Sequence, residues 1–86
     1  MPELFRFYGF VFFFYSREHE PLHVHVEGND GLAKFVYNDS TSTFDLEMAV
    51  NVKAGDLRKI KRIVADNKDN IVRAWHKHFG TDGKDC

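Results

Sequence analysis

Apolar and polar residues alternate in the first half of the chain and recur at helical spacing in the second half. The strict alternation over Leu22–Glu27 is typical of a half-buried strand. Shorter runs at Leu32–Tyr37 and about Ser42–Glu47 predict two further strands. The run Leu4–Tyr15 is almost entirely aromatic or β-branched, which favours a first strand covered on both sides. Gly9 within it predicts a bulge or a close approach of backbone.

Two turns predict how these strands pair. The segments 28–31 and 38–41 are rich in Gly, Asn, Asp and Ser, which favour hairpin turns. Folding at these turns places four pairs opposite one another: Val24 with Phe35, Val26 with Ala33, Phe35 with Phe44, and Ala33 with Leu46. Both hairpins then collect apolar side chains on one face of the sheet and polar side chains on the other.

From Ala54 onward the apolar residues recur every three or four positions, as on an amphipathic helix. Asn67 interrupts this stripe, so the segment is either one kinked helix or two helices, ending at Gly80. We therefore predict an α+β fold, with one antiparallel sheet of about four strands and one long kinked or two C-terminal helices packed on its apolar face. In this packing Trp75, Leu57 and Ile60 contact Val24, Phe35 and Phe44.

The length of 86 residues suits a single domain, which we place at residues 1–80 with a mobile tail at 81–86. Nine Phe, three Tyr and one Trp supply the large side chains that so small a core needs. The run Phe10–Tyr15 is too short to span a membrane, which takes about 20 apolar residues. With a lone cysteine, Cys86, and no spanning segment, we expect a cytoplasmic protein without membrane association.

Charge is divided unevenly along the chain. Residues 1–52 hold three Lys/Arg and eight Asp/Glu, whereas residues 53–80 hold eight Lys/Arg and three Asp, so the two parts carry −5 and +5. Either the two parts attract each other or the basic helix faces solvent. In the functional reading, Arg58, Lys61 and Arg62 form a basic surface for an acidic partner such as RNA or DNA.

Three histidines, His19, His23 and His25, fall within seven residues. Alternation puts His23 and His25 on the polar face of one strand, about 6.5 to 7 Å apart at Cα. His25 is expected in one row with Lys34 and Asp45 across the sheet.

Three readings of this cluster stay open. His19, His23, His25 and Lys34 are candidates for acid–base catalysis on RNA, whose 2′-hydroxyl is a built-in nucleophile. His23, His25 and Glu27 are alternatively ligands for a divalent metal. The third reading is a solvated face of mixed charge, in which the side chains pair across strands.

The chain resembles a small bacterial family, domain of unknown function 4160. The resemblance rests on the segment 7–11 (FYGFV), on His19-x-Pro21-x-His23-x-His25 and on a helical end with Trp75. In that family a second proline is usual at the position of Leu22, and Phe at the position of Val24. The resemblance implies a compact α+β domain and marks the three histidines as candidate functional residues. It also implies a small cognate protein encoded by a neighbouring gene, as in toxin–antitoxin pairs.

These observations lead to three functional hypotheses. The first is a toxin–antitoxin-type domain that binds or cleaves nucleic acid through its histidine-rich sheet face. The second is a module that binds a divalent metal. The third is a non-catalytic interaction protein that forms a homodimer, or binds a partner, through its aromatic first strand.

Overall fold

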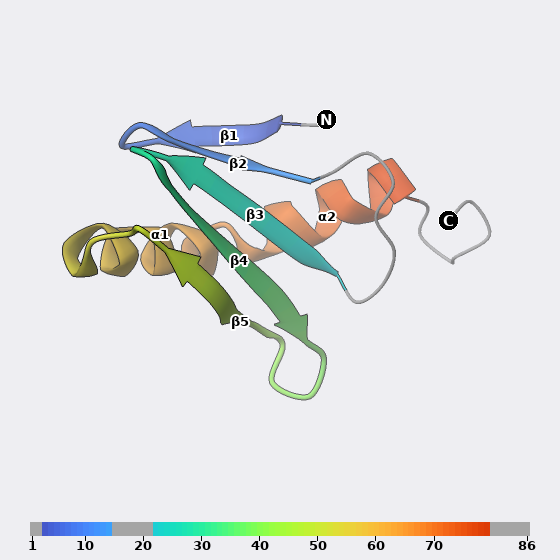
Figure 1. Ribbon diagram of the computed structural model, residues 1–86. Helices are drawn as coiled ribbons and strands as arrows, with labels where there is room; N and C mark the ends of the chain where they lie inside the picture. Colours follow the sequence, from blue (N-terminus) through green and yellow to red (C-terminus); the bar gives the residue numbers. More distant parts are fainter. Residues whose placement is uncertain (1–2, 15–21, 80–86) are drawn as a thin grey trace.

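The structure, a computed structural model of the 86-residue chain, describes residues 3–14 and 22–79. In chain order the elements are β1 (Glu3–Phe7), β2 (Phe10–Phe13), β3 (His23–Gly28), β4 (Gly31–Asn38), β5 (Thr43–Val50), α1 (Ala54–Asp66) and α2 (Lys68–Phe79). The strands follow one another across a single antiparallel sheet, with both helices on one face of it (Figure 1). The predicted α+β class with one antiparallel sheet is confirmed, and of the two helical arrangements left open the structure has two C-terminal helices. The prediction of about four strands is wrong, because there are five.

The additional strand arises because the aromatic run at the start of the chain folds back on itself. Tyr8 and Gly9 have φ values of 53° and 81°, both positive as a two-residue type I′ turn requires. Phe7 therefore pairs with Phe10 in an antiparallel hairpin. Gly9 thus reverses the chain between two strands instead of forming a bulge within one.

β3 and β4 pair as the alternation predicts. Asn29–Asp30, with φ values of 50° and 65°, form a second two-residue turn of the same kind. Val24 lies opposite Phe35 and Val26 opposite Ala33, and all four side chains are buried. The predicted register of this hairpin is confirmed.

The predicted register of β4 with β5 is wrong. Ser42 has a φ of 56°, so it lies in the turn, and the hairpin closes at Asn38 and Thr43. The backbone N–H of Ser40 donates to Oδ1 of Asn38 at 2.9 Å, which stabilises this longer turn. The observed pairs are Phe35 with Leu46, Tyr37 with Phe44, and Ala33 with Ala49, in place of Phe35 with Phe44 and Ala33 with Leu46.

β5 also contains a bulge that reverses the alternation of its side chains. Lys34 pairs with Met48 while its neighbour along β4 pairs with Leu46, so Glu47 is an extra residue on β5. Beyond this point the even-numbered positions change face. Met48 and Val50 therefore lie on the face away from the helices, whereas Leu46 faces them.

Asn67 separates the two helices. Its side-chain amide nitrogen donates to the carbonyl oxygen of Ile63 at 2.9 Å, and its own carbonyl accepts from the N–H of Ile71 at 2.9 Å. The polar residue on the apolar stripe thus satisfies backbone groups where α1 ends and α2 begins. This decides between the two predicted arrangements in favour of two helices.

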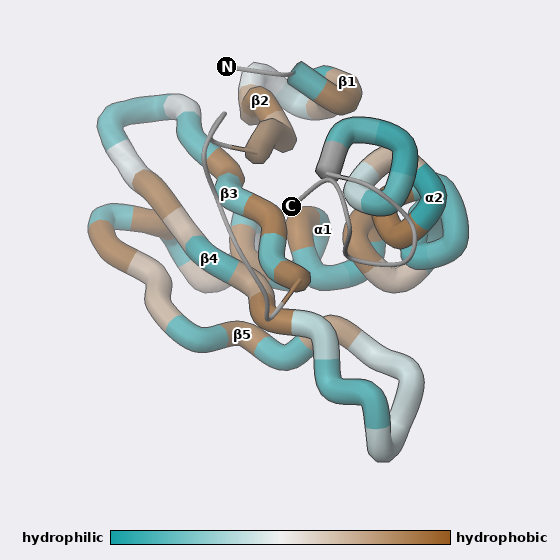
Figure 2. The backbone as a smooth tube through the Cα atoms, turned by 90° about the vertical axis from the view of Figure 1, so that its right-hand side faces the viewer, coloured by the Kyte–Doolittle hydropathy of each residue, from teal (hydrophilic) through white to brown (hydrophobic). Residues whose placement is uncertain are grey.

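The core lies between the sheet and the helices, which form two layers in Figure 2. Trp75 and Ile60 are 1% exposed and belong to the same buried cluster as Val24 and Phe35. Phe44 is partly buried against this cluster. Leu57, which was expected in the same contact, is half-buried and is not part of this buried cluster.

Phe10 and Phe12 of β2 belong to this core, whereas Phe13 is buried against His25 on the opposite face of the sheet. Phe10, Phe12 and Phe13 are each buried, whereas Phe7 and Tyr8 in the first hairpin are exposed. A homodimer through the first strand stays a prediction, and its accessible aromatic groups are Phe7 and Tyr8. Neither α1 nor α2 is long and apolar enough to cross a membrane. The predicted tail at 81–86 lies outside the described residues.

We predict that Gly28→Ala destabilises the protein more than Gly9→Ala. A Cβ on Gly28 would collide with the carbonyl oxygen of Gly9 and lie 2.9 Å from Cδ1 of Phe10. A Cβ on Gly9 has Asn29 Oδ1 as its nearest neighbour, at 3.8 Å, so its cost is the positive φ alone. In urea denaturation we expect losses of about 3 kcal/mol for Gly28→Ala and about 1 kcal/mol for Gly9→Ala. Equal losses would contradict the close backbone approach.

Candidate functional site

His23 and His25 lie on the same face of β3, as their spacing predicts. Their ring centroids are 5.1 Å apart and their planes are inclined by 81°, so one ring points its edge at the other. The neighbouring residues Val24 and Val26 point the other way, into the core. The pairing of these two imidazoles is therefore a property of strand alternation.

His23 is packed against a core aromatic residue. Its side chain is 8% exposed, and its ring centroid is 5.4 Å from that of Trp75. The pairing of β2 with β3 ends at Phe13 and His25, where the two strands diverge in Figure 1. Trp75 also meets the ring of Phe14 edge-on, with ring centroids 5.1 Å apart. It therefore contacts the residue that follows β2 as well as the first residue of β3. His23 therefore has a structural position and is largely withheld from solvent.

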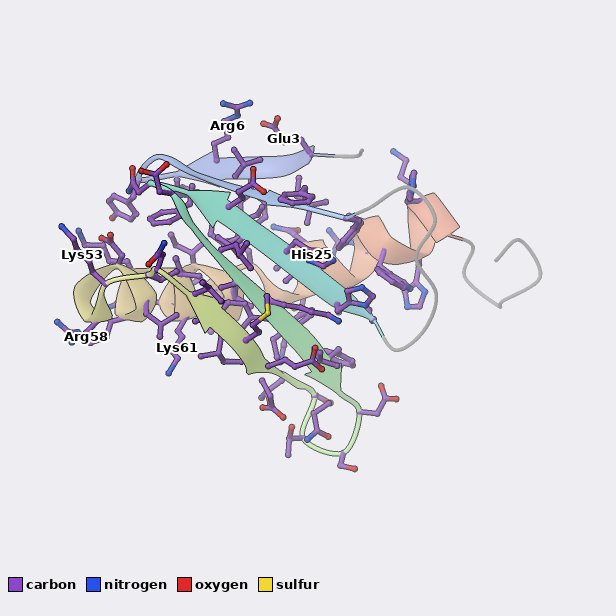
Figure 3. The ribbon with its side chains drawn as sticks, viewed as in Figure 1. Glu3, Arg6, His25, Lys53, Arg58 and Lys61 are labelled. Atoms are coloured by element: carbon purple, nitrogen blue, oxygen red, sulfur yellow. The ribbon has the colours of Figure 1, made fainter. Side chains whose placement is uncertain are left out.

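His25 is the more accessible of the two. Its side chain is half-buried, its ring stacks on Phe13 at 5.5 Å with an interplanar angle of 23°, and it lies opposite Lys34 on β4. Nζ of Lys34 is 3.0 Å from Oε1 of Glu47, and the two side chains are 30% and 53% exposed. An imidazole, an ammonium group and a carboxylate thus come from three adjacent strands (Figure 3 labels His25).

The row across the sheet differs from the predicted one. Met48, not Asp45, lies opposite Lys34, because the hairpin closes later and β5 bulges at Glu47. Asp45 lies opposite Val36 and accepts a hydrogen bond of 3.2 Å from the side chain of Asn38. The carboxylate that accompanies Lys34 is therefore that of the bulged residue.

The metal hypothesis receives no third ligand from the described residues. Within residues 3–14 and 22–79, no three His, Cys, Asp or Glu side chains come together as a metal site would require. Glu27 is exposed and lies between Val11 and Leu32 across the sheet. His19 lies outside the described residues.

The predicted basic residues are all exposed on α1. Arg58, Lys61 and Arg62 are spaced by three and four positions, so they share one side of the helix. Figure 3 shows Arg58 and Lys61 projecting outward from α1, with Lys53 at its start. His25 belongs to the opposite face of the sheet, so the two predicted sites are separate surfaces.

Within residues 3–14 and 22–79, no ion pair joins the basic helices to the acidic sheet. Among the described residues, every ion pair stays within one layer: Arg6 with Glu3, Lys34 with Glu47, and Arg62 with Asp66. In the first pair, hydrogen bonds from the guanidinium of Arg6 hold the pKa of Glu3 below its ordinary value. Arg58, Lys61 and Arg62 of α1 are exposed, and none of them forms a described ion pair with the sheet.

Comparison with known proteins identifies a family. The family described as a domain of unknown function, DUF4160, matches residues 9–76 of the 86-residue chain. The chain belongs to this family. No curated protein and no solved structure matches it. In this DUF4160 member the matched region begins in the turn of the first hairpin and ends just beyond Trp75.

Sequence reasoning missed two surface features of this DUF4160 member. Nζ of Lys59 lies 5.0 Å from the ring centroid of Tyr8, which joins α1 to the first hairpin. Leu32, Met48 and Val50 form an exposed apolar patch on the face away from the helices. Alternation alone assigns Met48 and Val50 to the core face, and no sequence signal marks the bulge that moves them.

We predict that His23→Ala destabilises the protein far more than His25→Ala. Removing the buried imidazole leaves a cavity beside Trp75, for which we expect a loss of about 3 kcal/mol in urea denaturation. His25 is half-buried, so its truncation should cost about 1 kcal/mol or less. Trp75, the one tryptophan of the chain, reports the transition by fluorescence. A loss at His25 as large as that at His23 would contradict this assignment.

Proposed function

We propose that the protein binds nucleic acid through the exposed face of α1 that carries Arg58, Lys61 and Arg62, as part of a toxin–antitoxin-type role. The observation that carries the proposal is that this face is basic, exposed and largely unneutralised. Arg62 alone of the three has an ionic partner among the described residues, Asp66 at 3.8 Å, and both side chains are mostly exposed. Such an exposed pair contributes little and yields readily to a phosphate.

The chemistry of the face suits phosphate groups. Arg58 and Arg62 are one helical turn apart, about 6 Å along the axis, and their planar guanidinium groups match phosphate oxygens. The chain as a whole carries −1, so the attraction is local and short in range. We therefore expect modest affinity with a strong dependence on salt.

We predict that the double variant Arg58→Ala/Arg62→Ala binds a fluorescein-labelled single-stranded RNA of 20 nucleotides at least 10-fold more weakly than the wild type. On a single strand each lost phosphate contact removes about 0.7 from the magnitude of the slope of log affinity against log salt, so the loss of two contacts should lower that magnitude by about 1.4. Fluorescence anisotropy at several salt concentrations measures both quantities.

The matched control is Lys77→Ala, which removes an exposed positive charge from the other end of the helical layer. It should leave affinity within twofold of the wild type. If the control and the double variant lost the same RNA affinity, the effect would come from net charge alone. That result would contradict a binding site on α1. Absence of binding by the wild type at low salt would contradict nucleic-acid binding itself.

A second candidate function, RNA cleavage, is favoured by the pairing of His25 with Lys34. A half-exposed imidazole can exchange a proton with the 2′-hydroxyl, and the adjacent ammonium group can hold a phosphate oxygen. Oε1 of Glu47 already forms an ion pair with Nζ of Lys34 at 3.0 Å, so a phosphate group has to displace the carboxylate of Glu47. The burial of His23 leaves His25 as the titratable group best exposed for this chemistry.

Under this second candidate we predict that His25→Ala and Lys34→Ala each lower the rate of RNA cleavage at least 100-fold. Glu47→Gln, which releases Lys34, should preserve or raise the rate. The assay follows a labelled RNA and the DNA of the same sequence, which lacks the 2′-hydroxyl and should stay intact. Intact RNA with the wild type, or equal cleavage by all variants, would contradict this function and leave binding on α1 unaffected.

A further inference from the structure

A cavity of about 380 Å³ opens beside β5, between that strand and the helices. Its apolar lining consists of Phe35, Phe44, Leu46 and Ala65. Its polar lining consists of Thr43, Asp45, Lys61 and Lys68, so two ammonium groups and one carboxylate border the cavity. Phe35, Phe44 and Leu46 lie on the face of the sheet that bears the core. The cavity is therefore the uncovered end of the core layer, at the open side of the sheet.

β5 is an edge strand of unusual exposure. It is eight residues long and has β4 as its one neighbour among the described strands. Ala49 is exposed, although its cross-strand partner Ala33 is 1% exposed in the core. A long, open edge strand presents backbone groups to which another extended segment can add.

We propose that an extended segment of a different protein adds beside β5 as a sixth strand and fills this cavity. Its side chains alternate in direction, so every second one faces the helices. One of these is bulky and apolar and enters the cavity. The next on the same face is acidic and pairs with Lys61 or Lys68, whose charges no described acidic side chain neutralises by an ion pair.

The charges on β5 argue against a second copy of this chain as the occupant. In antiparallel pairing of two β5 strands about a two-fold axis at Leu46, Asp45 of one copy would lie opposite Glu47 of the other. Like charges opposite one another destabilise a sheet. A partner of different sequence avoids this repulsion. The inference does not rest on nucleic-acid binding, although Lys61 belongs to both surfaces.

The probe is a phage-displayed library of random 12-residue peptides, selected on the full chain and counter-selected on Ala65→Trp. Ala65 is exposed on α1 and lines the cavity, so the indole should fill the cavity without disturbing the core. Ala54→Trp makes the same change at an exposed position of α1 outside the cavity lining. We expect enriched peptides in which bulky apolar and acidic residues occupy the same face of an extended strand.

Calorimetry with a synthetic copy of the most enriched peptide then tests the mode of binding. We expect at least 10-fold weaker binding to Ala65→Trp and to Lys61→Glu/Lys68→Glu, and unchanged binding to Ala54→Trp and Arg58→Ala/Arg62→Ala. Two further peptides carry N-methyl groups on the backbone, one at the odd-numbered residues and the other at the even-numbered residues. One of these two peptides should not bind, because strand addition uses main-chain hydrogen bonds. If Ala65→Trp does not fold, the lysine variant decides.

Three results would overturn the proposal. The first is no enrichment over the counter-selected variant. The second is that both N-methylated peptides bind as well as the unmodified one, or that Arg58→Ala/Arg62→Ala abolishes peptide binding. In both cases the peptide would not occupy the edge of β5. The third is a dimer in light scattering that Ala65→Trp, but not Ala54→Trp, dissociates, because a second copy would then be the occupant. None of these three results decides whether α1 binds RNA, which is measured separately.

Discussion

The contact of Trp75 with two separating strands holds the two layers of this protein together. The indole of α2 meets Phe14 beyond β2 and His23 at the start of β3, at the point where the pairing of these strands ends. One aromatic side chain therefore anchors the last helix and closes the gap in the sheet. The same contact determines the role of His23, because it turns a polar strand position into part of the packing.

The two layers leave different surfaces open. The helical layer exposes basic side chains of α1, whose charge the acidic sheet does not neutralise by ion pairs among the described residues. The far face of the sheet exposes His25 and Lys34 beside an apolar patch. The sheet lies between these surfaces, so binding at one does not require the other. This separation allows the two proposed activities, nucleic-acid binding on α1 and RNA cleavage at His25, to be tested independently.

The open side of the sheet is a third surface with its own chemistry. The cavity beside β5 joins an apolar lining to Lys61, Lys68 and Asp45, and it lies beside the edge strand of the sheet. The bulge at Glu47 has two effects on this strand. It provides the carboxylate for Lys34, and it moves Met48 and Val50 to the far face. In our proposal, the carboxylates of Asp45 and Glu47 on this edge strand favour a segment of a different protein over a second copy of the chain.

The sequence by itself determined the features that depend on residues close in the chain. Alternation predicted the pairing of Val24 with Phe35 and the shared face of the two histidines, and the polar notch at Asn67 predicted either a kink or a break between helices. Tertiary structure alone decided the bulge at Glu47 and the burial of His23. The physical reason is that a bulge depends on the partner strand, and burial on a side chain about 50 residues away in sequence. The turn at Tyr8–Gly9 lies between these cases, because glycine permits a positive φ without requiring a reversal of the chain.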